Sequence, residues 1–179
     1  MSSLTDADEI KALRFVTSGK ARVEFGPWGK HWWLSDPDLT ATKQLTLVRV
    51  RMRPGAGHQF HYHPAREEII YVLEGVAEQW VDQEKRRLNA GEIAFVPKGV
   101  VHAIHNPSKR PMSFLAILSP ARAKGPFLVD CYNDEPWRSL REPFAYREVD
   151  PRTGEAKTHR GRGRGRPHSD DASRRGARS

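Results

Sequence analysis

The sequence predicts an all-β protein, a sandwich or barrel of short strands followed by a disordered C-terminal tail. Two patterns support this fold class. Apolar residues alternate with polar ones over short runs, and Gly, Pro or Asn residues interrupt the chain after each run. No long apolar pattern of helical period lies between the runs. We therefore expect short strands joined by turns.

The clearest strand lies within Gln44–Pro54. Val48, Val50 and Met52 alternate there with arginines, so one face of the strand is apolar and the other is charged. The same reasoning predicts five further strands, bounded by turn residues. They are Glu68–Leu73, Val76–Val81, Ile93–Val96, Val101–His105 and Met112–Leu118.

Composition divides the chain into three regions. Residues 1–20 are polar, with a short helix expected at Asp8–Phe15, and form a flexible N-terminal segment. Residues 21–150 form the β-barrel domain, and the tryptophans Trp28, Trp32 and Trp33 are expected to cover one end of its core. Residues 151–179 are rich in Gly, Arg and Ser and contain no aromatic residue, so they cannot bury enough apolar surface to fold.

The net charge of +8 is concentrated in the tail. Residues 152–179 contain nine basic and three acidic residues, a net charge of +6, which leaves +2 for the rest of the chain. The run Arg160–Arg166 resembles the arginine–glycine segments of RNA-binding proteins, which neutralise phosphates without reading sequence. It has no interleaved aromatic residue for base stacking. We therefore favour a solvated extension over weak, non-specific nucleic-acid contact.

Several features indicate a cytoplasmic protein without a membrane partner. No stretch approaches the ~20 apolar residues that a membrane span needs. The first residues lack the basic region and apolar run of a secretory signal. The single cysteine, Cys131, forms no intrachain disulfide and is expected to be a buried small hydrophobic residue rather than a catalytic thiol.

Candidate metal ligands are concentrated in Gly55–Gly75. His61 and His63 are two residues apart, so on a strand their imidazoles project from the same face. Glu68 opens the next strand and can return a carboxylate to the same point, and His102 begins a later strand. Such a mixed nitrogen and oxygen set suits Fe, Mn, Ni, Co, Cu or Zn better than Ca or Mg.

The spacing of this region resembles the two conserved motifs of the cupin superfamily. Gly55–Gly75 fits G-x5-H-x-H-x4-E-x6-G, and Gly91–Asn106 fits G-x5-P-x-G-x2-H-x3-N, at all ten fixed positions. The short spacer is similar to that of small single-domain, quercetin dioxygenase-like members. With its flanking strands the resemblance covers about residues 21–120. It implies a cupin jelly-roll barrel (a double-stranded β-helix) that binds one divalent transition metal, with His61, His63, Glu68 and His102 as the ligands.

Three other polar residues are also considered. Gln79 shares parity with Ala77 and Val81, which are expected to face the barrel interior. A glutamine there needs a hydrogen-bond partner, which substrate, metal-bound water or the protein backbone can provide, so Gln79 is a candidate catalytic residue. His58 and His105 lie outside the motif positions, and a surface or inter-sheet role is expected for both.

A site of three histidines and one carboxylate leaves up to two open positions on a six-coordinate ion. The resemblance then implies a metal-dependent dioxygenase that acts on a small oxygen-rich substrate, with Fe as the expected metal and Glu68 as a catalytic residue. Two alternatives stay open because they use the same ligands. One is a non-redox isomerase, lyase or decarboxylase, and the other is binding of a small molecule without turnover. The resemblance also implies a homodimer.

Overall fold

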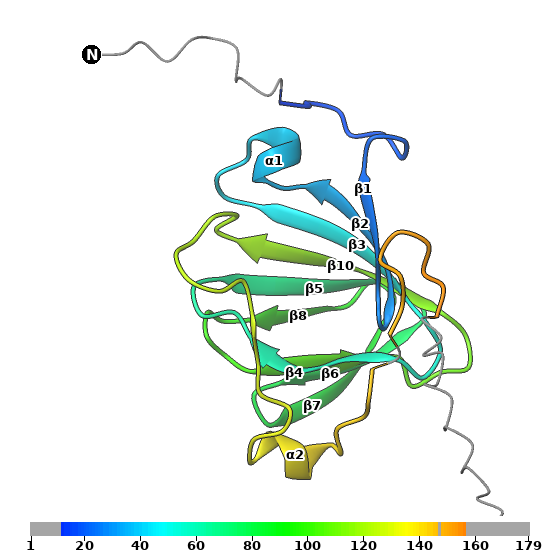
Figure 1. Ribbon diagram of the computed structural model, residues 1–179. Helices are drawn as coiled ribbons and strands as arrows, with labels where there is room; N and C mark the ends of the chain where they lie inside the picture. The colour runs from blue at the N-terminus through cyan, green and yellow to red at the C-terminus, as the bar shows by residue number, and fades with distance from the viewer. Residues whose placement is uncertain (1–11, 147, 157–179) are drawn as a thin grey trace, which may run out of the picture.

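The computed structural model describes residues 12–146 and 148–156. Two antiparallel sheets face each other across a common core (Figure 1), which confirms the all-β class. The six-stranded sheet contains, in spatial order, β1 (Arg22–Gly26), β2 (Gly29–Ser35), β3 (Thr46–Met52), β10 (Met112–Ser119), β5 (Glu67–Glu74) and β8 (Ile93–Val96). The five-stranded sheet contains β11 (Val129–Asp130), β4 (Gly57–Tyr62), β9 (His102–His105), β6 (Val76–Val81) and β7 (Glu84–Asn89). Two short helices, α1 (Pro37–Thr40) and α2 (Trp137–Leu140), lie outside the sheets.

Strand β3 shows how the alternating pattern builds the core. Val48, Val50 and Met52 are buried, while the intervening arginines are exposed on the other face of the sheet. The neighbouring strand β10 pairs with β3 so that Phe114 lies opposite Val50. Removing one such large apolar side chain from water stabilises the fold by about 1.5–3 kcal/mol. The core therefore lies between the two sheets, as the pattern predicts.

All six strands predicted from the sequence are present, with ends that differ by at most two residues. Strand β7 was not predicted, because Glu84–Asn89 is charged and shows no apolar alternation. It forms through its backbone, which pairs with β6 in a hairpin whose turn includes Asp82 at φ 52°. The predicted helix at Asp8–Phe15 is wrong over residues 12–15, which are not helical, and residues 8–11 lie outside the described residues.

The tryptophans near the start of the barrel lie on both faces of β2 and the turn before it. Trp28 and Trp33 pack against the core, as expected. Trp32 points to the opposite face, because it is one residue from Trp33 in a strand. There the Nζ atom of Lys30 lies 4.7 Å from the Trp32 ring centroid. The expectation that all three cover the core is therefore wrong for Trp32.

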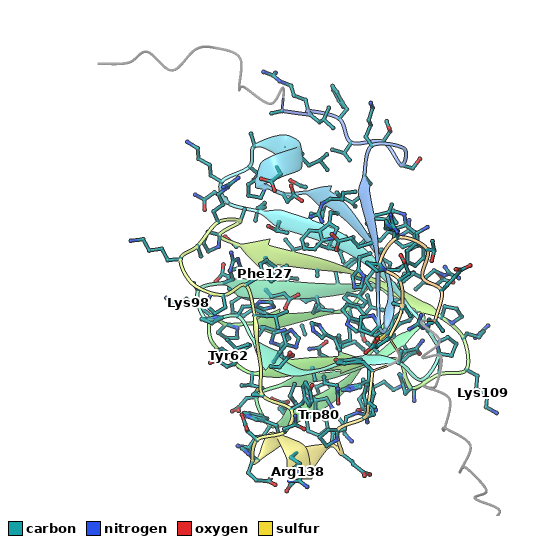
Figure 2. All side chains as sticks on the ribbon, in the orientation of Figure 1. Tyr62, Trp80, Lys98, Lys109, Phe127 and Arg138 are labelled. Carbon is teal, nitrogen blue, oxygen red and sulfur yellow. The ribbon has the colours of Figure 1, made fainter. Side chains whose placement is uncertain are left out.

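The chain after β11 covers the outer face of the five-stranded sheet. Phe60, Trp80 and Cys131 form a second apolar cluster there, with Trp137 of α2 packed against it. Figure 2 shows Trp80 on the side of the barrel that faces α2, which carries Arg138. Cys131 is buried, as expected, and burial raises the pKa of its thiol to about 11. This cluster fixes the segment that contains α2 against the barrel, where Trp137 packs on Phe60 of strand β4.

Residues 148–156 form a turn beside β1 (Figure 1). The Phe25 N–H donates to the Pro151 carbonyl at 2.7 Å, and Val149 and Ala156 form an isolated bridge. Residues 151–156, which composition assigned to the tail, therefore contact the barrel. Residues 1–11 and 157–179 lie outside the described residues, so the domain boundaries stay predictions. In the described part of the chain, no helix is long and apolar enough to cross a membrane.

Candidate metal centre

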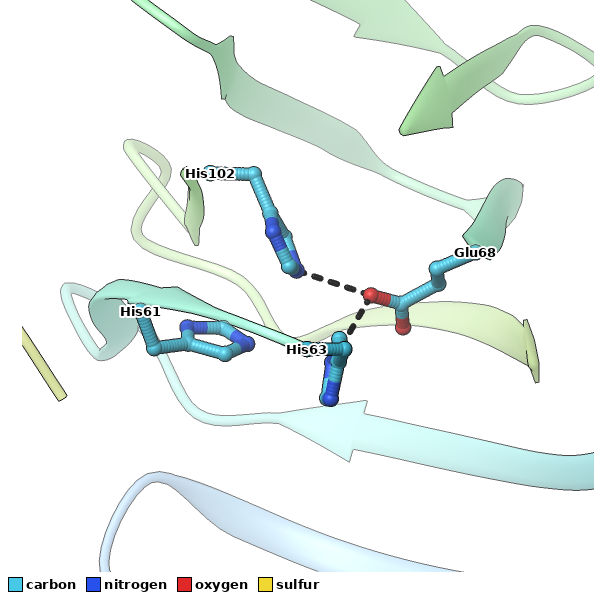
Figure 3. A group of neighbouring side chains, drawn as sticks. All are labelled: His61, His63, Glu68 and His102. Atoms are coloured by element: carbon cyan, nitrogen blue, oxygen red, sulfur yellow. Dashed lines mark ion pairs between the residues drawn. The ribbon is translucent and has the colours of Figure 1, made fainter. Parts of the chain in front are cut away.

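Four predicted residues come together inside the barrel (Figure 3). His61 lies on β4, His63 just after its end, Glu68 on β5 and His102 at the start of β9. All four side chains are buried, and one potential ligand atom from each lies within 4.8 Å of all the others. Cross-strand pairing explains part of this geometry, because His61 and His102 are direct partners between β4 and β9. The sequence motif therefore corresponds to a single cluster.

The corner formed by the second motif is tied directly to the first. Gly99 has a φ of 76°, a left-handed conformation that favours glycine. In this conformation its N–H donates to the His63 carbonyl at 3.0 Å. The turn that precedes His102 is thereby fixed to the segment that carries His63.

Each of the three imidazoles is oriented by a main-chain carbonyl at its Nδ1 atom. An Nδ1–H that donates to a carbonyl leaves the lone pair on Nε2, which is the arrangement common in metal-binding histidines. The pairs are His61 with the Gln59 carbonyl at 2.8 Å, His63 with the Phe127 carbonyl at 2.7 Å, and His102 with the Val100 carbonyl at 3.3 Å. The tautomers follow from these acceptors.

The donor set fits a divalent cation. The Oε2 atom of Glu68 lies 2.8 Å from Nε2 of His102 and 3.3 Å from Nε2 of His63. Among the described residues, Oε2 of Glu68 and Nε2 of His102 are buried and have no other hydrogen-bond partner. With the protons on Nδ1, these are acceptors that face each other, and an unsatisfied buried polar group costs about 1–3 kcal/mol. A cation between them removes this repulsion, and the nitrogen and oxygen donors suit a transition metal.

The charges of the cluster agree with this fit. Burial alone would raise the pKa of Glu68, but a positive group at the Nε2 atoms of His102 and His63, whether a proton or a cation, lowers it. With protons there the pKa is about 2, so Glu68 is a carboxylate at neutral pH. Burial lowers the pKa of His61 well below its usual value, and the nearby His58 and His102 lower it further. The His61 imidazole is therefore neutral, the form that binds metal ions.

A cavity of about 340 Å³ opens in front of the cluster. Aliphatic side chains of both sheets line its inner part, and Trp28, Trp33 and Phe127 line the part nearer the surface. The charged side chains in its wall are Glu24 and Glu68, and no lysine or arginine of the described residues contributes to the wall. The cavity is therefore mostly apolar, with acceptor groups at the candidate metal centre.

Phe127 contributes to both the cavity and the cluster. Its carbonyl accepts the hydrogen bond from His63, and its ring lies edge-on to the His63 ring with 5.2 Å between centroids. The guanidinium of Arg66 packs against the ring of Phe127, 4.6 Å from the centroid, and is not part of the cavity wall. Phe127 belongs to the loop between β10 and β11, which the motifs do not include.

His58 lines this cavity between the two sheets, so the surface alternative is wrong and the inter-sheet alternative holds. The reason is a bulge in β4. His58 pairs with Ile104 and His61 with His102, so two residues of β4 lie opposite one residue of β9. The bulge places His58 and His61, three residues apart, on the same face. Burial, with the nearby His102, lowers the pKa of His58 to about 3.

His105 faces away from the cluster, as its spacing from His102 predicts. It is nevertheless neither at the surface nor between the sheets, because the segment after α2 covers it and leaves the residue 2% exposed. Its ring lies 6.1 Å from that of Phe144. The sequence motif contains no signal for this segment.

Gln79 is buried, as its parity predicts, but it is not part of the cavity that contains the four candidate ligands. It lines a separate hollow beside β7 and β8. Its side-chain amide donates to the Trp80 carbonyl at 2.9 Å, which is the backbone alternative considered from the sequence. The Gln79 side chain does not line the cavity with the candidate ligands, and its catalytic role stays a prediction.

A barrel of two antiparallel sheets with three histidines and a glutamate gathered inside it defines a class of small jelly-roll proteins with a candidate metal centre. The family model for the cupin domain matches residues 48–118, which include every motif position. Among solved structures, an RmlC-like cupin from Shewanella frigidimarina is 27% identical, with a TM-score of 0.54, over 62% of this chain and 94% of that chain. Residues 48–118 of this chain are therefore a cupin domain.

Two curated proteins are similar to part of the chain. Mannose-1-phosphate guanylyltransferase of Escherichia coli K12 is 28% identical over 98 residues, which cover 55% of this chain and 20% of that protein. Oxalate decarboxylase OxdC of Bacillus subtilis 168 is 30% identical over 94 residues, covering 50% of this chain and 24% of that protein. The chain thus spans about a fifth to a quarter of the length of these relatives, neither of which is named for dioxygenase chemistry.

Proposed function

We propose that this protein is a metal-dependent cupin enzyme that cleaves a small, largely apolar substrate with dioxygen. The substrate would bind the ion through neighbouring oxygen atoms, as an enol, a diketone or a hydroxylated aromatic ring does. One observation carries this proposal: the candidate metal centre opens into a cavity that is otherwise mostly apolar. Such a wall accommodates an apolar ring and dioxygen without leaving polar groups unpaired.

The charge of the cavity supports this substrate class. Phosphates and dicarboxylates are usually bound by arginine or lysine through charge-assisted hydrogen bonds. The charged side chains that line this cavity are Glu24 and Glu68, both acidic. An anionic substrate would therefore depend on the ion alone, whereas a neutral chelating substrate gains apolar contacts over most of its surface.

The residues of the chain would have separate tasks. His61, His63, His102 and Glu68 would hold the ion, and the carbonyls at each Nδ1 atom would keep the rings oriented. The bound metal supplies Lewis acidity or redox reactivity. The carboxylate of Glu68 is ionised at neutral pH, so an Oε atom could accept the proton of a substrate hydroxyl that the bound ion would acidify. The apolar wall would exclude competing water.

A second candidate function is decarboxylation without net oxidation. The similarity to oxalate decarboxylase of Bacillus subtilis favours it, at 30% identity over 94 residues. The acidic cavity wall disfavours a dianionic substrate such as oxalate, and for that reason we place this function second.

Metal analysis combined with oxygen uptake distinguishes the two functions. Purified protein reconstituted with Fe(II) should consume dioxygen with a diketone, a catechol or a flavonol, and the Zn(II) form should not. His102→Ala protein is the control for uptake caused by free iron. Turnover of oxalate under strict anaerobiosis, at similar rates with several divalent ions, would contradict the oxygenase proposal and favour the decarboxylase.

A further inference from the structure

His58 lies beside the candidate metal centre without being part of it. Its ring stacks on that of His61, with centroids 3.8 Å apart and planes inclined by 25°. On its other side it stacks with Trp28 at 4.7 Å and 19°. Both faces of the imidazole are therefore covered by aromatic rings, and only its edge, which carries the polar nitrogen atoms, is free to meet a ligand.

The bulge that directs His58 inward is fixed from outside the barrel. Its two central residues, Gln59 and Phe60, both point outward. The amide of Gln59 exchanges two hydrogen bonds with the main chain of Phe144, at 2.9 and 3.0 Å. The ring of Phe60 packs against Trp80 and Trp137. These contacts make the inward position of His58 a stable property of the fold rather than one of several side-chain arrangements.

The edge of His58 has hydrogen-bonding capacity that the described residues do not use. A neutral imidazole offers one N–H donor and one acceptor nitrogen. No hydrogen bond joins the His58 side chain to any described residue, although the side chain lines a cavity with mostly apolar walls. A polar group in such surroundings is poorly solvated unless a partner is present. A ligand in the cavity is a natural partner because it would lie next to His61.

We propose that His58 is a substrate-binding residue, whose ring edge forms a hydrogen bond with a ligand oxygen beside the candidate metal centre. Stacking between Trp28 and His61 fixes the ring so that little conformational freedom is lost when the ligand binds. This role selects ligands that carry an oxygen close to the chelating group and rejects apolar compounds of the same shape. The inference rests on the proposed function, because it requires a chelating ligand in the cavity.

A binding experiment tests this role without turnover. The Zn(II)-loaded full-length protein is titrated with 3-hydroxyflavone, a fluorescent chelating probe, and Zn(II) content is measured for each sample. His58→Phe keeps an aromatic ring between Trp28 and His61 but removes the hydrogen bond. We expect its Zn(II) content to stay near that of the wild type, while the probe Kd rises about fivefold, the effect of one lost hydrogen bond.

Two further variants separate hydrogen bonding from packing. His58→Gln retains a donor and should bind the probe within about twofold of the wild type, whereas His58→Ala should bind it at least as weakly as His58→Phe. This pair also serves if the phenylalanine variant does not fold. His105→Phe, a buried histidine outside the cavity, is the control and should leave the probe Kd unchanged.

The outcomes distinguish this inference from the proposed function. If wild-type protein binds the probe and the His58 variants bind it equally well, the role of His58 is refuted and the substrate class survives. If Zn(II)-loaded wild-type protein does not bind the probe, the proposed substrate class fails, and the inference fails with it. Loss of Zn(II) from His58→Phe would show that the ring supports the ion rather than the ligand, which also overturns the proposal.

Discussion

Replacing Gln59 with leucine tests how the β4 bulge is held in place. The Gln59 side chain is 3% exposed, and its amide accepts from the Phe144 N–H at 2.9 Å and donates to the Phe144 carbonyl at 3.0 Å. Leucine has a similar size but offers neither bond. Because each net hydrogen bond contributes about 1 kcal/mol, Gln59→Leu should destabilise the protein by about 2 kcal/mol. For a chain of this length, that corresponds to a decrease in Tm of about 6 °C.

Gln79 provides a matched control, because it is a second buried glutamine on the neighbouring half of the same sheet. Among the described residues its amide makes one hydrogen bond, to the Trp80 carbonyl, and its Oε1 atom has no partner. Gln79→Leu loses that bond but also removes an unsatisfied acceptor, so its stability should change by less than about 1 kcal/mol. Calorimetric melting of metal-free protein measures both variants. Equal melting temperatures for Gln59→Leu and the wild type would refute this account of the bulge.

The other predictions concern the metal centre, pH and assembly. His102→Ala should lose most bound metal by elemental analysis, whereas His105→Ala should retain it; the reverse result would exclude the ligand assignment. Glu68→Gln should keep part of its metal through the three histidines and lose most oxygen uptake, and undiminished uptake would remove Glu68 as the base. Burial lowers the pKa of His31 to about 4 and those of His58 and His105 to about 3. The unfolded chain binds these protons near pH 6.5, whereas the folded protein does not. The free energy of unfolding of the metal-free protein, measured by urea titration, should therefore fall as the pH is lowered from about 7 to 4. A flat profile would contradict the burial of these rings. Light scattering should give twice the 20.4 kDa chain mass if the expected homodimer forms, and the chain mass itself would contradict it.

The parts of the fold that follow from sequence are those with a periodic or fixed spacing. The alternation in β3 identifies its buried face, and the spacing of His61, His63 and Glu68 identifies residues that come together in the barrel. Both depend on local geometry, in which two residues of a strand correspond to one repeat. Strand β7 lacks such a signal because both of its faces are largely exposed and its stability comes from backbone pairing.

The position of His58 shows where local spacing fails. Counting by twos from His61 places His58 on the outer face, and one additional residue in β4 reverses that result. The contacts that hold the bulge come from Phe144 and Trp137, which lie far along the chain. Parity likewise gives the face of the sheet on which Gln79 lies, but not which hollow on that face its side chain enters.

The two contacts that Phe127 makes with His63 link access to the cavity with affinity for the ion. The same residue forms part of the cavity wall and supplies the carbonyl that orients the imidazole, so a ligand that displaces its backbone also removes the acceptor at Nδ1. Thermodynamic linkage makes this coupling reciprocal. An ion that requires the His63 ring in one orientation favours one position of the β10–β11 loop. A ligand that requires another position of the loop lowers the affinity for the ion, and the ion lowers the affinity for that ligand by the same factor.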